Sequence, residues 1–156
     1  MEQYVGLDVS QDVTHMCVVN RDGKILWQGD CASTPEAIGK TIRKYAPDVE
    51  KIGLESGPLS TWHWHGLTDM GLPAICIDSY HAHGVLKLQM NKTDKNDAHG
   101  LAQIMRCGWY KAVQIKSFLS HESRALFRAR SNLVSVRTDI VNQMRGTLKT
   151  FGILIK

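Results

Sequence analysis

Three short apolar segments follow one another at the start of this chain, too close together for a helix to lie between them. They cover residues 3–9, 13–19 and 24–31, and Asn20-Arg21-Asp22-Gly23 separates the second from the third. That tetrapeptide is a typical hairpin turn. The pattern therefore predicts three consecutive antiparallel strands, which need helices packed against them to complete a core.

Alternating helices and strands are expected next. Ser33-Thr34-Pro35-Glu36 is a helix-start signal for a helix to about Ala46. A strand over 51–55, a helix over 59–70 and a strand over 73–77 follow. The order β-β-β-α-β-α-β combines an antiparallel meander with right-handed crossovers. It predicts an α/β fold of the ribonuclease H-like (RuvC-like) kind, a mixed five-stranded sheet with flanking helices.

Further helices are predicted in the C-terminal part. Residues 79–91 are poorly patterned, but residues 94–105 carry small and apolar side chains on one face, which suits packing on the sheet. From residue 120 to about residue 150 no proline occurs, and two neighbouring apolar columns repeat every seven positions. The columns comprise Leu126, Leu133 and Ile140, and Phe127, Val134, Val141 and Leu148. We expect a long coiled-coil-like helix that self-associates, giving a homodimer or higher homo-oligomer.

Charge is distributed unevenly along the 156 residues. Residues 1–119 hold 12 Lys and Arg against 13 Asp and Glu, a net charge of −1, whereas residues 120–156 hold 7 against 2, a net charge of +5. A basic tail on a neutral body indicates an anionic partner for the tail. Its arginines suit nucleic-acid phosphates, although a solvated coiled-coil flank is the alternative. These candidates are Arg124, Arg128, Arg130, Arg137 and Arg145.

The length allows one ordinary domain with an appended arm. We assign residues 1–116 to the domain and residues 117–156 to the arm. The apolar Ile153, Leu154 and Ile155 near the last residue have little left to pack against, which is typical of the end of a fragment.

Neither a membrane segment nor a secretory signal peptide is expected. No apolar run reaches the roughly 18 residues needed to span a bilayer, and the N-terminus lacks a basic region ahead of an apolar one. The four cysteines, Cys17, Cys31, Cys76 and Cys107, are far apart in apolar stretches. They are therefore predicted to be buried thiols in a reducing cytoplasm.

Acidic residues lie in or at the ends of three predicted elements. Asp8 lies in the first predicted strand and Glu55 ends the fourth. A buried carboxylate is costly without a partner, and if these strands are neighbours a divalent cation would relieve the repulsion. Asp94 and Asp97 are three positions apart at a helix start, so both point to one face. Four oxygen donors suit Mg²⁺ or Mn²⁺, and two ions would support phosphodiester cleavage or strand transfer.

Each of these residues also has an ordinary interpretation. A strand aspartate can satisfy a turn or pair with a lysine, and an acidic pair at a helix start commonly serves as a cap. Lys92 and Lys95 flank the acidic pair and are candidates either for phosphate neutralisation or for a solvated loop. The order of strand Asp, strand Glu and helical D-x-x-D on this frame is what favours the metal site.

Two histidine pairs, His63-x-His65 and His81-x-His83, are candidate metal ligands by their residue type and close spacing. On a helix, side chains two positions apart point in different directions, and neither pair lies in a predicted strand. We do not expect a histidine metal site.

The acidic motifs resemble those of the DEDD-type insertion-sequence transposases, the RuvC-like family that also includes Piv-type site-specific DNA invertases and bridge-RNA-guided recombinases. The resemblance implies that Asp8, Glu55, Asp94 and Asp97 bind Mg²⁺ in a catalytic domain, followed by an arm that helps subunits associate. It rests on Gly6-Leu7-Asp8-Val9-Ser10, Glu55-Ser56-Gly57, Lys92-Thr93-Asp94 with Asp97-Ala98, and the arm residues Leu133, Val134, Arg137, Thr138, Asn142, Arg145 and Phe151-Gly152-Ile153.

The resemblance also implies partners and a cellular setting. A C-terminal domain would carry a nucleophilic serine, and a structured guide RNA would select donor and target DNA. This chain would then be the metal-binding part of a prokaryotic, cytoplasmic recombinase that is nucleoid-associated when bound to DNA. Gln11 and Asp78-Ser79 depart from the family pattern, which leaves detailed contacts there open.

Three other functions fit parts of the sequence. A RuvC-like junction nuclease would share the acids but does not need a long arm. A sugar-kinase or actin-like phosphotransferase can share the G-x-D-x-S strand, Gly6 to Ser10, but needs a second large half. A non-catalytic nucleic-acid-binding and dimerisation module would keep the fold without using the four acids.

Overall fold

The computed structural model describes residues 2–86 and 94–155, and its description of side chains omits those of residues 85, 86, 94 and 95. The chain divides into two compact units, Met1–Ile115 and Lys116–Lys156. The first unit holds the sheet and four helices, and the second holds one long helix. Lys92 therefore lies outside the described residues. The side chains of Asp94 and Lys95 also lie outside the description.

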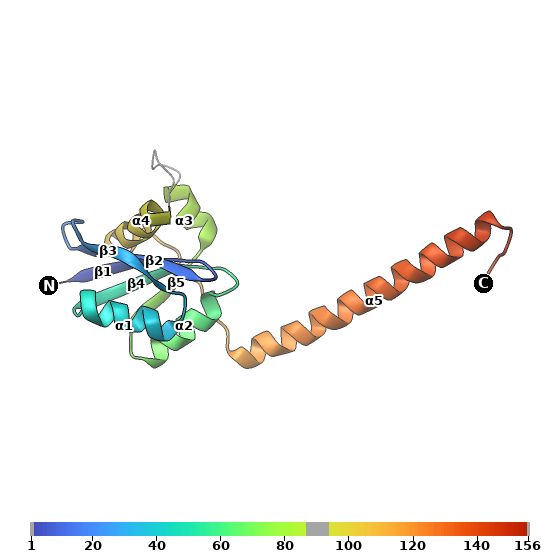
Figure 1. Cartoon of the computed structure of the whole chain (residues 1–156), viewed down its shortest axis with the longest axis horizontal. Coiled ribbons are helices and arrows are strands. Elements are labelled where there is room, and N and C mark those ends of the chain that lie inside the picture. Colours follow the sequence, from blue (N-terminus) through green and yellow to red (C-terminus); the bar gives the residue numbers. More distant parts are fainter. Residues whose placement is uncertain (1, 87–93, 156) are drawn as a thin grey trace. The chain divides into compact units, whose positions relative to one another are not determined.

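A mixed five-stranded sheet forms the centre of the first unit (Figure 1). The strand order is β3-β2-β1-β4-β5, with β1 antiparallel to β2 and parallel to β4. This confirms that the first and fourth strands are neighbours, as the sequence predicts. The strands are β1 (Gln3–Val9), β2 (Val13–Asn20), β3 (Ile25–Ala32), β4 (Val49–Glu55) and β5 (Ala74–Ile77).

Helices cover both faces of this sheet, which explains why β1 is apolar on both sides. Figure 1 shows α1 (Pro35–Tyr45) and α2 (Ser60–Asp69) on one side, and α3 (Ser79–Leu86) and α4 (Asp94–Cys107) on the other. Side chains alternate along a strand, so Val5 and Leu7 join the core beneath α1 and α2. The residues between them face α4.

Close contact between α4 and the sheet depends on Gly6 and Gly53, which are opposite each other on β1 and β4. A Cβ atom at Gly6 would lie 2.2 Å from the Ala98 carbonyl oxygen and 2.4 Å from the Ala102 nitrogen. A Cβ atom at Gly53 would lie 2.5 Å from the Met105 side chain. The helix backbone therefore rests directly on the strand backbone, as only glycine permits.

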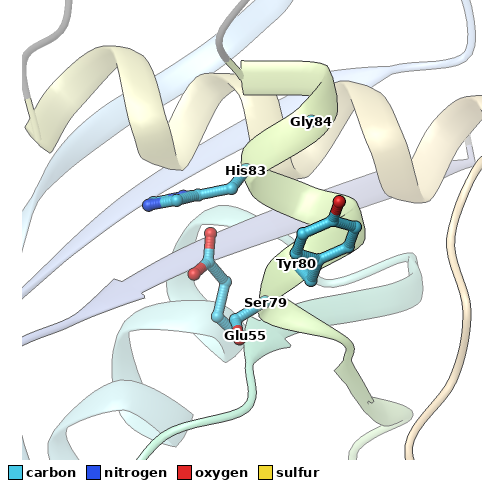
Figure 2. Close-up of a pocket in the computed structure, with 5 residues that line it drawn as sticks. All are labelled: Glu55, Ser79, Tyr80, His83 and Gly84. Carbon is cyan, nitrogen blue, oxygen red and sulfur yellow. The ribbon is translucent and has the colours of Figure 1, made fainter.

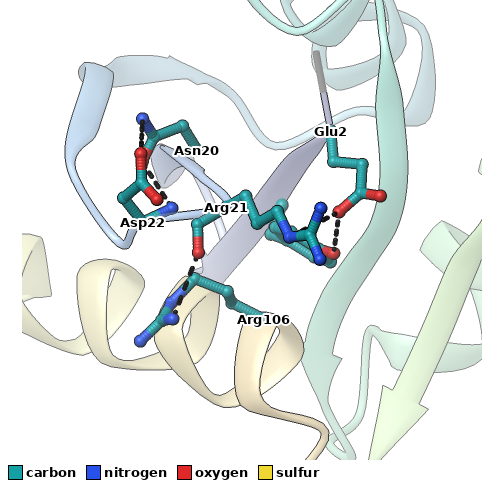
Figure 3. A network of polar contacts seen from close by, with 6 residues as sticks. Glu2, Asn20, Arg21, Asp22 and Arg106 are labelled. Atoms are coloured by element: carbon teal, nitrogen blue, oxygen red, sulfur yellow. Dashed lines mark hydrogen bonds and ion pairs between the residues drawn. The ribbon is translucent and has the colours of Figure 1, made fainter.

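The hairpin between β2 and β3 is tied to the C-terminal end of α4 (Figure 3). Gly23 has a φ of 81°, the left-handed conformation that such a turn favours in glycine. Gln103 Nε2 donates to the Gly23 carbonyl at 2.7 Å, and Arg106 Nη1 donates to the Arg21 carbonyl at 3.3 Å. The end of α4 is thereby fixed beside the start of β1, whose Gln3 pairs with Asn20.

Local capping signals in the sequence set the first helix. Thr34 Oγ1 accepts from the Ala37 nitrogen at 3.2 Å, and Pro35 occupies the first helical position. The predicted start of α1 is confirmed.

The sequence analysis missed α3. Asp78 Oδ1 accepts from the nitrogens of Tyr80 and His81 at 2.8 and 3.3 Å, which caps this helix. Only Ala82 is buried among its described side chains, so the segment shows no apolar periodicity. The sequence pattern therefore predicts no element over residues 79–91.

The cysteine prediction was wrong at one position. Cys17 and Cys76 are buried and Cys31 is partly buried, whereas Cys107 is exposed because it ends α4 beyond the sheet. Burial raises the pKa of the Cys17 thiol to about 11, so this thiol stays protonated at neutral pH.

The second unit is α5 (Phe118–Thr150), a continuous helix of 33 residues. Ser117 Oγ accepts from the Ser120 nitrogen at 3.3 Å and caps its start, and Gly152, with a φ of 75°, follows its end. None of its residues is buried, so both predicted apolar columns are open to solvent in the single chain. Across the described residues, no helix combines the length and hydropathy that crossing a membrane requires.

Candidate metal and nucleic-acid site

Asp8 and Glu55 occupy adjacent positions at the carboxyl ends of two parallel strands. Each comes one residue after the last paired position of β1 and β4, where Leu7 is opposite Leu54. Each also comes two residues after a glycine that faces α4. Because strand side chains alternate, both carboxylates point to the α4 side of the sheet. Both are partly exposed.

The N-terminal end of α4 lies toward the same end of β1. Gly6 meets α4 at Ala98, and the C-terminal end of the helix is bonded to the hairpin beside the start of β1. The helix therefore runs antiparallel to β1, with its first turn toward Asp8. Asp97, immediately before Ala98, is partly buried there. The fold thus brings strand and helix acids toward one region.

Among the described residues, no group of three or more His, Cys, Asp and Glu side chains has the arrangement of a metal site. The Asp94 side chain, one of the four acids that the sequence assigns, lies outside that set. The donor chemistry nevertheless fits a hard divalent cation, because the acids at this end of the sheet offer only carboxylate oxygens.

Glu55 faces a cavity of about 450 Å³ beside α3 (Figure 2). Figure 2 shows the Glu55 carboxylate directed toward His83, with the Tyr80 ring next to it. Ser56 links the end of β4 to the start of α3, since its nitrogen donates to the Ile77 carbonyl at 2.8 Å and its Oγ accepts from the Ser79 nitrogen at 3.2 Å. The lining residues are Glu55, Ser79, Tyr80, His83 and Gly84.

A second cavity, of about 580 Å³, lies on the other side of Glu55. It is lined by the ends of β1 and β4 and the turns that follow them, including Ser10 and Gly57. Glu55 lines both cavities.

His15 and Asp30 lie in the same row across the sheet, and the sequence analysis missed them. Asp8 is opposite His15, and His15 is opposite Asp30, so all three share one face. His15 Nδ1 lies 2.6 Å from Asp30 Oδ1. The hairpin turn predicts that β2 pairs with β3. It does not predict which residues are opposite each other, because the register of the two strands shifts between Val18 and Val19.

His63 and His65 lie on the predicted helix α2, whereas His81 and His83 lie on α3, which the sequence did not predict. His63 is buried, and its Nδ1 lies 2.9 Å from the Leu59 carbonyl oxygen. On α3, His83 lines the cavity beside Glu55. On α4, burial lowers the pKa of His99, so this ring is neutral at pH 7 and adds no positive charge near the acids.

The candidate arginines all lie on α5 and are exposed. Arg130 and Arg137 share a shallow hollow of about 440 Å³ with Leu126, Leu133 and Val134. Basic and apolar side chains thus adjoin on the second unit.

A family model described as a transposase, of the DEDD type named for IS110, matches residues 5–153. The chain is also similar to the transposase for insertion sequence element IS1111A of Coxiella burnetii (strain RSA 493 / Nine Mile phase I). The two are 26% identical over 155 residues, which cover 96% of this chain and 39% of that relative. The chain thus spans well under half the length of this relative.

Two solved structures of Thermus thermophilus RuvC resemble the chain. RuvC in complex with a Holliday junction substrate has a TM-score of 0.52 at 11% identity, covering 72% of this chain and all of RuvC. Another RuvC structure has a TM-score of 0.50 at 13% identity, covering 71% of this chain and 99% of RuvC. At such identities the likeness concerns the fold alone, and it confirms the predicted RuvC-like class.

Proposed function

This chain belongs to the IS110-type family of DEDD transposases, and we propose that it is the metal-binding part of a recombinase that cleaves and exchanges DNA strands. The observation that carries the proposal is the adjacency of Asp8 and Glu55 on neighbouring strands, facing the side where α4 begins. Two carboxylates so placed repel each other, and a divalent cation offsets that repulsion.

Asp8, Glu55, Asp94 and Asp97 would hold Mg²⁺ or Mn²⁺ on this proposal. Such ions stabilise charge on the attacking and leaving oxygens of a phosphoryl transfer. The chain itself contributes rigidity, because Asp8 and Glu55 are carried by central strands and Asp97 by a helix seated on Gly6.

Mn²⁺ or Mg²⁺ should stabilise the chain. At about 100 times the Kd, binding adds about 2.7 kcal/mol, which raises Tm by roughly 10 °C. Asp8→Asn should abolish this shift while the variant stays folded. Asp69→Asn is the matched control, since Asp69 is an exposed carboxylate at the end of α2 and should leave the shift intact. Differential scanning calorimetry with and without metal provides the measurement.

Absence of any shift in the wild-type chain would contradict the metal site. It would favour the alternative function, a non-catalytic module that binds nucleic acid and dimerises. A shift that survives Asp8→Asn but not Asp69→Asn would place the metal elsewhere.

We assign the first contacts with nucleic acid to the exposed arginines of α5. The exposed arginines can neutralise phosphates without reading bases, so binding should be weak and largely independent of sequence. On this proposal strand exchange itself also needs a nucleophilic serine from a further domain and a structured guide RNA.

Replacing Arg124, Arg128 and Arg130 with Ala should reduce the salt dependence of DNA binding. Each phosphate neutralised contributes about −0.9 to the slope of log affinity against log salt, so the slope should flatten by up to about 3 units. Fluorescence anisotropy with one duplex at several salt concentrations measures it. Gln143→Ala, an uncharged change on the same helix, serves as control. An unchanged slope in the triple variant would move the phosphate-binding surface off this part of α5.

A further inference from the structure

Tyr80 presents an aromatic ring to solvent at the cavity that Glu55 also lines (Figure 2). Its side chain is 85% exposed, yet it lines the same cavity as the carboxylate. A lone exposed tyrosine needs no explanation. The backbone of Tyr80 is fixed by the Asp78 cap and by the bond from the Ser79 nitrogen to Ser56, so the point at which its side chain leaves α3 is set relative to the end of β4.

The cavity has room for a flat group. Its volume of about 450 Å³ is typical of small-molecule sites. Gly84 contributes no side chain to it, and a Cβ atom there would meet nothing within 4 Å. The described residues that line the open space thus combine an aromatic residue, Tyr80, with the polar Ser79, His83 and Glu55.

We propose that this cavity seats an unpaired nucleobase of the DNA strand that reacts at Asp8 and Glu55, with the base stacked on Tyr80. The inference rests on the proposed function and adds the place where a base of the substrate strand is bound. Every nucleobase has a face that stacks on an aromatic ring, and the gain is largely independent of sequence. In a duplex both faces of a base are covered by its neighbours, so the seated base must be unstacked from them.

The test compares single-stranded DNA binding by the wild-type chain, Tyr80→Ala, Tyr80→Phe and Gly84→Leu. The probe is a short oligonucleotide with 2-aminopurine, whose fluorescence reports stacking. Elevated salt suppresses phosphate contacts made by α5, and EDTA removes metal, so the result is independent of the metal site. Trp109→Ala is the control, because Trp109 is 74% exposed and is not among the residues lining the cavity.

Tyr80→Ala should weaken binding by about tenfold or more and remove the stacking signal, as expected for loss of one base–aromatic stack. Tyr80→Phe should bind like the wild type. Gly84→Leu should lose affinity as Tyr80→Ala does, because its side chain fills the cavity. If Gly84→Leu melts at a lower temperature than the wild type, its binding is not compared, and Tyr80→Ala alone tests the proposal.

Equal binding by the wild type and Tyr80→Ala would overturn the proposal, as would an equal loss in Trp109→Ala. A dependence on Tyr80 seen with RNA and not with DNA of the same sequence would also overturn it. Loss of the metal-induced Tm shift with this stacking intact would instead remove the proposed metal function alone.

Discussion

Gly6→Ala is expected to prevent the first unit from folding stably. The new Cβ atom would lie 2.2 Å from the Ala98 carbonyl oxygen and 2.4 Å from the Ala102 nitrogen. Both are backbone atoms of α4 and cannot rotate away, so the helix must lift off the sheet. That movement opens the packing around Leu101 and Met105, which are buried there.

The expected loss exceeds about 4 kcal/mol, a large share of the about 5–15 kcal/mol that stabilises a typical domain. Urea denaturation followed by tryptophan fluorescence measures it. Gly53→Ala should cost less, because the three atoms nearest to its Cβ atom all belong to the flexible Met105 side chain. Gly57→Ala is the control, since nothing lies within 4 Å of the added Cβ atom. A Gly6→Ala protein as stable as Gly57→Ala would contradict the close packing of α4.

Val134→Asp combined with Val141→Asp should convert an associated chain into a soluble monomer. The two apolar columns of α5 are exposed in the single chain, and pairing with a second copy would bury them. Charges placed in that seam lose their hydration without gaining a partner. A cost of several kcal/mol weakens association by more than about 100-fold.

Sedimentation velocity over a range of concentrations measures the association. Ser135→Asp with Asn142→Asp is the matched control, because it adds the same charge at positions about 100° further around the helix, outside both apolar columns. Circular dichroism should show α5 still helical in both double variants. A wild-type chain that stays monomeric at the highest concentration would contradict the self-association of α5.

Much of the fold could be predicted because local signals and global topology agree. The Asn20 to Gly23 turn, the Thr34 cap and the β-α-β order each indicate one arrangement, and the sheet has it. Helix α3 was missed because its start depends on a side-chain cap and its described residues bury little apolar surface. The spacing of apolar residues in a sequence indicates a buried helix face, but it does not indicate a side-chain cap.

The candidate site was only partly predictable. Asp8 and Glu55 stand out in sequence because each interrupts an apolar strand. The His15–Asp30 pair does not, since its place beside Asp8 depends on pairing between distant strands and on a register shift. Tyr80 and Gly84 line the cavity beside Glu55 because β5, which pairs with β4 at Glu55, leads directly into α3, and because the Ser79 nitrogen donates to Ser56.

Anomalous scattering from a crystal of this chain soaked in Mn²⁺ tests the central claim most directly. We expect a strong peak between the carboxylates of Asp8 and Glu55, within reach of Asp97 on α4, and its loss in Asp8→Asn. Carboxylate oxygens should lie about 2.0–2.6 Å from the ion, as for hard divalent cations. A peak away from these acids, or none with Mn²⁺ saturating, would contradict a shared metal centre at the ends of β1 and β4.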